Sequence, residues 1–114
     1  MHRYRLTVEY DGTPYVGFQR QTNGYAVQEA IERAIRKFTG EDVTLHVAGR
    51  TDTGVHALAQ VCHVDLTKQW TAFRVLEAIN AHLVMAEERV SIVDVEEMDQ
   101  DFHARFSETT RHYL

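Results

Sequence analysis

Residues 27–38 read VQEAIERAIRKF, and their apolar side chains recur at the spacing of one helical face. That face consists of Val27, Ala30, Ile31, Ala34, Ile35 and Phe38. The charged residues fall outside it, namely Glu29, Glu32, Arg33, Arg36 and Lys37. Gly40 follows as a typical C-terminal stop. The segment therefore predicts an amphipathic helix that buries one stripe of side chains.

The residues on either side of this helix alternate between apolar and polar side chains, which is the pattern of half-buried strands. Before the helix, one face of residues 3–10 carries Tyr4, Leu6, Val8 and Tyr10. Asp11-Gly12 stops that alternation. After the helix, residues 43–47 alternate in the same way and end near Gly49. A strand is thus expected on each side of the helix.

The remaining elements complete a recognisable order. A third strand is expected over 58–66, where apolar residues of both parities indicate burial on both faces or a bulge. Thr71 is a suitable N-cap for a helix over 72–83. The fourth strand covers 90–95, and its apolar phase slips between Ile92 and Val93, which predicts a bulge. The order β-α-β-β-α-β predicts an α+β fold of the ferredoxin-like split βαβ type, with both helices on one face of an antiparallel sheet.

Composition bounds the class of protein. The 114 residues carry 17 acidic and 12 basic side chains, a formal net charge of −5, which argues mildly against a nucleic-acid partner. Residues 87–101 hold seven of the acids and one base, so a basic face elsewhere stays open. The single cysteine, Cys62, allows no intrachain disulfide and lies in an apolar strand, where we expect it to be packed rather than reactive. We expect a cytoplasmic protein without a membrane span.

The seven histidines do not form a metal-ligand pattern. Three of them are spaced without any ligand frame: His56, His103 and His112. His46 and His63 lie in predicted strands and are interpreted as structural. We therefore expect no metal site. Trp70 and Phe73, near the second helix, are expected in the core or in a subunit interface.

The stretch Gly49–Ala57 reads GRTDTGVHA and lies between the second and third predicted strands. Its two glycines, Gly49 and Gly54, bracket a short polar run, so the backbone can turn tightly or approach a ligand closely. In an extended run, Arg50 and Asp52 point to the same side, and the guanidinium keeps the carboxylate ionised, as a nucleophile requires. A surface ion pair with Asp52 capping a turn accounts for the same spacing.

The motif GRTDxGVHA closely resembles the active-site signature of the tRNA pseudouridine synthase A family. Further segments match that family in order and approximate spacing: Glu9–Gly12, Gly17–Gln21, Val27–Glu29 and Asp101–Ser107, with Arg111 and Tyr113. The resemblance covers essentially the whole chain. Thr53 departs from it, because the family more often has alanine there.

The resemblance implies roles for six residues. Asp52 would be the catalytic aspartate, Arg50 would pair with it and help displace the target base from the RNA stack, and Tyr113 would stack on the uracil ring. Substrate-binding positions would be Arg20, Arg105 and Arg111. The resemblance also implies an isomerase that needs no cofactor and acts as a homodimer on the tRNA anticodon stem-loop.

The family's synthase core consists of two ferredoxin-like halves, and the second half is absent from this sequence. The chain is therefore expected to be the N-terminal piece of a longer enzyme, and such a piece alone is a doubtful catalyst. Residues 1–98 would form the first half, and residues 99–114 would begin the connection into the second.

Two other interpretations compete with this one. Asp52-Thr53-Gly54 is the triplet of aspartic proteases, which pair two such loops so that the carboxylates share a proton. Those enzymes are all-β, and Arg50 would keep both carboxylates charged. The second competing interpretation is a non-catalytic ferredoxin-like module that binds RNA or a regulatory ligand. The Lys/Arg-Gly-Phe pattern that RNA recognition motifs place on their sheet is missing.

Overall fold

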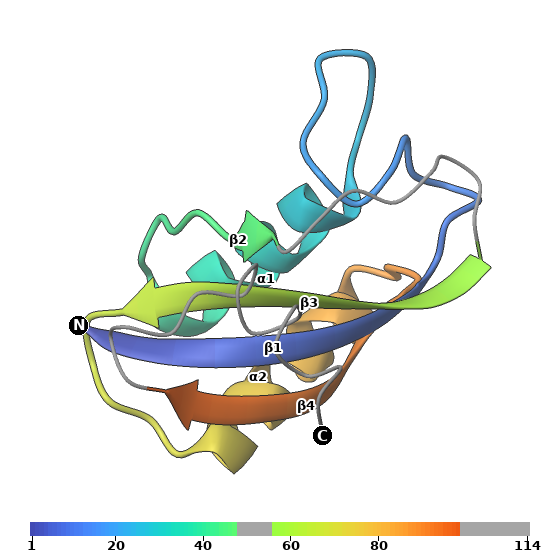
Figure 1. Cartoon of the computed structure of the whole chain (residues 1–114). Coiled ribbons are helices and arrows are strands. Elements are labelled where there is room, and N and C mark those ends of the chain that lie inside the picture. The colour runs from blue at the N-terminus through green and yellow to red at the C-terminus, as the bar shows by residue number, and fades with distance from the viewer. Residues whose placement is uncertain (48–55, 99–114) are drawn as a thin grey trace, which may run out of the picture.

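A computed structural model describes residues 1–47 and 56–98. The elements in chain order are β1 (His2–Asp11), α1 (Val27–Thr39), β2 (His46–Val47), β3 (His56–Leu66), α2 (Ala72–Met85) and β4 (Val90–Met98). This is the β-α-β-β-α-β order predicted from the sequence (Figure 1).

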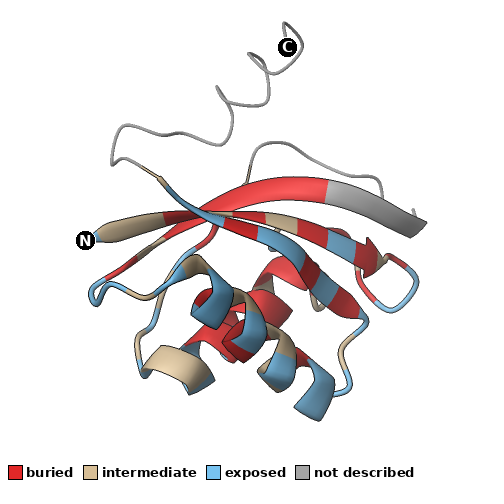
Figure 2. Ribbon diagram, turned by 90° about the horizontal axis from the view of Figure 1, so that it is seen from below, coloured by how far each residue is buried: buried red, intermediate tan, exposed pale blue. Residues whose placement is uncertain are grey.

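The four strands form one sheet in the order β2-β3-β1-β4, and every pairing in it is antiparallel. The sheet is one layer and the two helices form the other, since both cover the same face of the sheet (Figure 2). The predicted α+β, ferredoxin-like arrangement is therefore confirmed. An all-β aspartic protease fold is excluded by the two helices.

The alternation of β1 places its apolar side chains in the core. Its four even-numbered apolar residues are buried: Tyr4, Leu6, Val8 and Tyr10. They meet the buried stripe of α1, in which Ile31 and Ile35 are fully inaccessible. Each such aliphatic side chain contributes about 1.5–3 kcal/mol when fully buried. Strand β1 and α1 therefore belong to one apolar core between the two layers.

Strand β3 is buried on both faces along residues 60–64. Cys62 and Val64 pair with β1 residues that point toward the helices, whereas Val61 and His63 point to the opposite face. This confirms the expectation drawn from apolar residues of both parities. Burial also raises the pKa of the Cys62 thiol, and the negative charge of Glu32 adds to that effect. Cys62 is thus packed in the core, as expected, and its raised pKa disfavours the reactive thiolate.

The bulge predicted in β4 lies where the apolar phase slips. Thr7 of β1 pairs with Asp94, and the next residue, Val8, pairs with Ile92. Val93 is therefore the extra residue, and its side chain is 46% exposed. The bulge restores Val95 to the core face, where it is buried.

Strand β2 is shorter than predicted. The alternation of residues 43–47 predicted a strand over that range, but only His46–Val47 pairs with β3. The cause is visible at Leu45, whose backbone N–H donates to Glu32 Oε2 at 2.9 Å and whose carbonyl accepts from Gln28 Nε2 at 3.2 Å. Because α1 side chains bind both backbone groups of Leu45, the ladder to β3 begins one residue later.

The helix ends follow the sequence signals. Gly40 ends α1 in the left-handed conformation, with φ of 78°, and its N–H donates to the Arg36 carbonyl at 2.7 Å. The Thr71 side chain caps α2 by accepting the Arg74 N–H at 3.1 Å. Within residues 1–47 and 56–98, no helix has the length and apolar character that a membrane crossing requires.

The two aromatic residues near α2 have different environments. Trp70 packs against the core, with its ring centroid 4.6 Å from that of Phe38, and its backbone exchanges hydrogen bonds with the Tyr4 hydroxyl. Phe73 is 68% exposed on α2. Trp70 is therefore partly buried against the core, as expected, whereas for Phe73 the expectation of a subunit interface stays a prediction.

Candidate functional site

The motif at 49–57 occupies the connection from β2 to β3 and the first residues of β3. Most of the predicted site residues lie outside the described part of the chain: Arg50, Asp52, Arg105, Arg111 and Tyr113. Their roles stay predictions. Arg20 is the predicted site residue that the structure describes.

Strand pairing shows where the motif enters the sheet. β2 ends at Val47, whose partner in β3 is Cys62, whereas β3 begins at His56, whose partner is Asp11 at the end of β1. β3 therefore extends past β2 along the last part of β1. The described residues of the motif, His56 and Ala57, lie at the end of the sheet where β1 stops and residues 12–26 begin. The end of the matching segment Glu9–Gly12 therefore lies beside His56, the first described residue of the motif.

Backbone hydrogen bonds and the ring of Phe18 hold the connection from β1 to α1, residues 12–26, against the rest of the fold. Phe18 is fully buried, and its ring centroid lies 5.5 Å from that of Tyr10. The carbonyls of Gly17 and Phe18 accept the N–H groups of Val27 and Gln28, at 3.1 and 2.8 Å. Those N–H groups belong to the first turn of α1, where a helix has no internal acceptors. The backbone that leads into Arg20 is therefore fixed against the helix.

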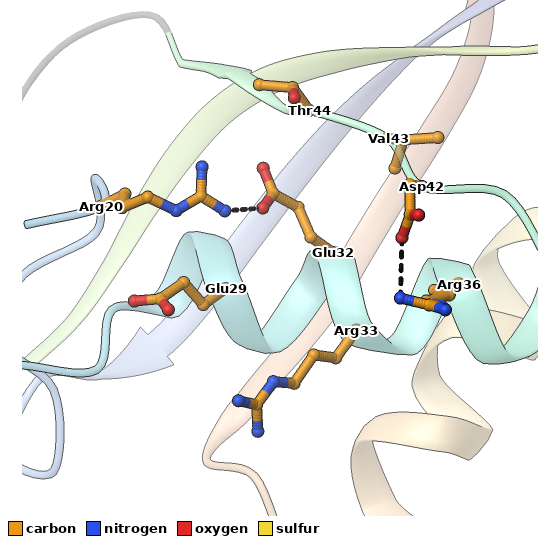
Figure 3. A pocket seen from close by; sticks show the side chains of 8 residues that line it. All are labelled: Arg20, Glu29, Glu32, Arg33, Arg36, Asp42, Val43 and Thr44. Carbon is orange, nitrogen blue, oxygen red and sulfur yellow. Dashed lines mark hydrogen bonds and ion pairs between the residues drawn. The ribbon is translucent and has the colours of Figure 1, made fainter.

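Arg20 combines a fixed backbone with an accessible side chain. Its N–H donates to Gln28 Oε1 at 2.9 Å, and its guanidinium forms an ion pair with Glu32 (Figure 3). The Arg20 side chain is 50% exposed and borders a cavity of about 270 Å³ between α1 and residues 42–44. A guanidinium held in this way can bind an anion such as a phosphate.

Glu32 is a residue that sequence reasoning placed wrongly. It was predicted outside the buried stripe of α1, yet only 10% of its side chain is exposed. Gln28, one turn earlier, is also buried. Both lie on the flank of the stripe that the Arg20 and Leu45 backbones cover. The sequence does show a polar pair at positions i and i+4 beside the apolar stripe. The same pattern occurs when such a pair is exposed to solvent, so the sequence alone could not predict the burial of Gln28 and Glu32.

On the sheet face opposite the helices, the basic side chains of β1 are paired. Arg3 donates from Nε to Asp65 Oδ1 at 2.8 Å and from Nη2 to Oδ2 at 2.9 Å. These hydrogen bonds hold the pKa of Asp65 below its usual range. Arg5 is paired with Asp94 and Glu96 of β4. Both arginines of this face are thus bound to carboxylates of the neighbouring strands.

The two strand histidines stack on each other on that same face. The ring centroids of His46 and His63 are 4.7 Å apart, with an interplanar angle of 17°. They are register partners in β2 and β3, which explains the contact. Over the described residues, no group of three His, Cys, Asp or Glu side chains is placed to hold a metal ion.

Comparison with known proteins assigns the chain to a family. The family model described as tRNA pseudouridine synthase matches residues 6–107. The protein named tRNA pseudouridine synthase A from Brucella anthropi is 69% identical over all 114 residues, and those of Brucella ovis and Brucella canis are 68% identical. The chain spans 45% of the length of each of these relatives. The match extends through the motif and through residues on either side of it, so the chain belongs to the tRNA pseudouridine synthase family.

Proposed function

We propose that this chain supplies the aspartate-bearing part of an enzyme that isomerises uridine to pseudouridine in the tRNA anticodon stem-loop. The observation that carries this proposal is the motif GRTDTGVHA at 49–57, on the connection into β3, in a chain of the tRNA pseudouridine synthase family. The relatives are named as tRNA enzymes, which supports tRNA as the substrate.

The isomerisation suits a carboxylate acting without a cofactor. It breaks the ribose C1′–N1 bond, turns the uracil and joins C1′ to C5, with no redox change and no group gained or lost. An ionised Asp52 can add to the base at C6 or receive the electron-deficient C1′, as the nucleophile of a retaining glycosidase does. A third route removes a ribose proton to give a glycal. In each route a neighbouring Arg50 keeps the carboxylate charged.

The enzyme must take its target base out of the RNA stack before reaction. Extrusion costs a few kcal/mol, and stacking of the base on an aromatic ring offsets about 1–3 kcal/mol of that cost. We assign the stacking to Tyr113 and the displacement of the base to Arg50. Arg20, Arg105 and Arg111 are assigned to the RNA backbone, because Arg side chains supply many phosphate contacts. The half-exposed guanidinium of Arg20 supports its part in this assignment.

We further propose that residues 1–98 form the first ferredoxin-like half of the synthase core and that residues 99–114 begin the connection to a second half. The second half would supply the other wall of the cleft. A homodimer in the cytoplasm is the assembly we expect. The share of the relatives' length that the chain covers supports a two-half core.

The proposal is tested by mapping pseudouridine in tRNA. The chain is joined to the part of the Brucella anthropi relative that it does not cover, and this joined protein is compared with its Asp52→Asn variant. We expect pseudouridine in the anticodon arm with the unchanged motif, and loss of turnover with retained tRNA affinity in the variant. A non-catalytic RNA-binding module would give no pseudouridine in either case. Modification of the anticodon arm by Asp52→Asn or Asp52→Ala would overturn the catalytic assignment.

A further inference from the structure

Two buried polar side chains of α1 hold two segments that come from different parts of the chain. Gln28 Oε1 accepts the Arg20 N–H at 2.9 Å, and Gln28 Nε2 donates to the Leu45 carbonyl at 3.2 Å. Glu32 accepts the Leu45 N–H at 2.9 Å and pairs with the Arg20 guanidinium. Gln28 also donates from Nε2 to Glu32 Oε2 at 3.0 Å, which joins the two side chains to each other.

Burial makes this arrangement specific. A carboxylate with a side chain only 10% exposed is costly unless it is paired, and Glu32 has three donors facing its two oxygens. Each of its partners is therefore held at a defined place. The Arg20 side chain, in contrast to that of Glu32, is half exposed to solvent. Glu32 occupies one nitrogen of the guanidinium, and a guanidinium has five N–H donors.

The second segment leads directly into the motif. Leu45 precedes β2, and β2 ends at Val47, two residues before Gly49. Gln28 and Glu32 bind the carbonyl and the N–H of Leu45, respectively, so the backbone of Leu45 is hydrogen-bonded to side chains of α1 and not to the sheet. One turn of helix thus holds the residue before β2, the strand that leads into the motif, and also the backbone and side chain of Arg20.

We propose that Gln28 and Glu32 are positioning residues for this enzyme: they hold Arg20 against an RNA phosphate while fixing the strand that leads to Asp52. This inference rests on the proposed function and adds to it a pair of residues that do not themselves touch the substrate. Glu32→Gln is the informative change, because all three partners of Glu32 are donors and the new amide nitrogen cannot accept from any of them.

The test measures the salt dependence of tRNA binding by the joined protein. Loss of one phosphate contact reduces the slope of log K against log [salt] by about 1. Arg20→Ala is expected to show that reduction, and Glu32→Gln is expected to show the same one. If Glu32 acts through Arg20, the double variant has the slope of either single variant. Glu32→Gln is also expected to weaken tRNA binding at least about tenfold, the lower end of the cost of one hydrogen bond to a charged group.

Asp42→Asn is the matched control. Asp42 pairs with Arg36 at 2.9 Å beside the same cavity, and both side chains are exposed. The substitution removes one negative charge, as Glu32→Gln does, but leaves Arg20 and Leu45 untouched. We expect it to leave the slope unchanged. This variant therefore measures any general effect of removing one negative charge on RNA affinity.

The outcomes separate this inference from the proposed function. If the unchanged joined protein makes no pseudouridine, the proposed function fails. If it is active and folded Glu32→Gln retains the original slope, as Asp42→Asn does, the positioning role is wrong. Circular dichroism shows whether Glu32→Gln folds. If Glu32→Gln does not fold, Gln28→Leu provides the test, because this change removes the Oε1 that accepts the Arg20 backbone N–H. Gln28→Leu must then reduce the slope for the inference to stand.

Discussion

Glu88 joins the connection that carries Arg20 to the turn between α2 and β4. Its Oε1 accepts from the Tyr15 hydroxyl at 2.8 Å, and its Oε2 accepts from the Tyr25 hydroxyl at 2.7 Å. The Tyr15 hydroxyl also accepts the Arg89 N–H at 3.0 Å. We predict that Glu88→Ala destabilises the protein by releasing both ends of residues 15–25.

The size of this effect follows from the two hydrogen bonds. A hydrogen bond to a charged group contributes about 1.5–3 kcal/mol, and the partial exposure of Glu88 favours the lower end. Glu88→Ala should therefore lower the free energy of unfolding by about 3 kcal/mol, and Tyr25→Phe by about 1.5 kcal/mol. Tyr15→Phe should cost more than Tyr25→Phe, because the Arg89 N–H also loses its acceptor.

Urea unfolding of the single and double variants tests this reasoning. The double variant Glu88→Ala, Tyr25→Phe should be less destabilised than the sum of its parts by about 1.5 kcal/mol, since both changes remove the same hydrogen bond. Strict additivity would refute the assignment. Spectroscopy offers a second measurement: burial, and then the hydrogen bond to Glu88, raises the pKa of Tyr25 to about 12, so Glu88→Gln should lower the pH at which tyrosinate appears.

Three further predictions concern the scaffold. Gly40→Ala should cost about 1–2 kcal/mol through backbone strain alone, because φ is 78° and no atom lies within 4 Å of the added methyl, and Gly40→Asn should cost less in the same urea titration. Asn80 Nδ2 donates to the Ile92 carbonyl at 2.9 Å, and Asn80 Oδ1 accepts the Ile92 N–H at 2.8 Å. Because Ile92 lies in the edge strand β4, Asn80→Ala should lower the free energy of unfolding by about 2 kcal/mol and leave these two backbone groups open to pairing with another chain, so that light scattering detects aggregation. Asp65, whose folded-state pKa lies below its unfolded value, adds stability that is present at neutral pH and lost as the pH falls through the folded pKa, so Asp65→Asn should flatten the acid limb of a stability–pH curve.

The fold was predictable because each element carries its own periodic signal. The stripe of α1, the alternation of β1 and the phase slip in β4 are local patterns, and the structure reproduces all three. The signal failed at residues 43–45, where alternation predicted a strand. There the backbone of Leu45 is bound by side chains from α1, which are distant in sequence and leave no trace in the local pattern.

The candidate site was predictable to a different extent. The motif at 49–57 and the position of Arg20 follow from residue identity, and the family match confirms the resemblance on which they depend. Glu32 was missed because a helical wheel gives the direction of a side chain but not the width of the buried face. That width depends on which segments cover the helix, and residues 17–20 and 43–45 cover the flank that holds Glu32.

The net charge of the chain does not set the electrostatic potential at Arg20. A formal charge of −5 argues against RNA binding only if the acidic side chains are free to repel phosphates. Two of the β4 acids, Asp94 and Glu96, lie beside Arg5, whose positive charge offsets part of theirs. The Glu32 carboxylate is buried and forms an ion pair with Arg20, whose side chain is half exposed to solvent. Since the field falls off within about 10 Å at ordinary salt, the sign near Arg20 depends on this local pairing rather than on the sum over the chain.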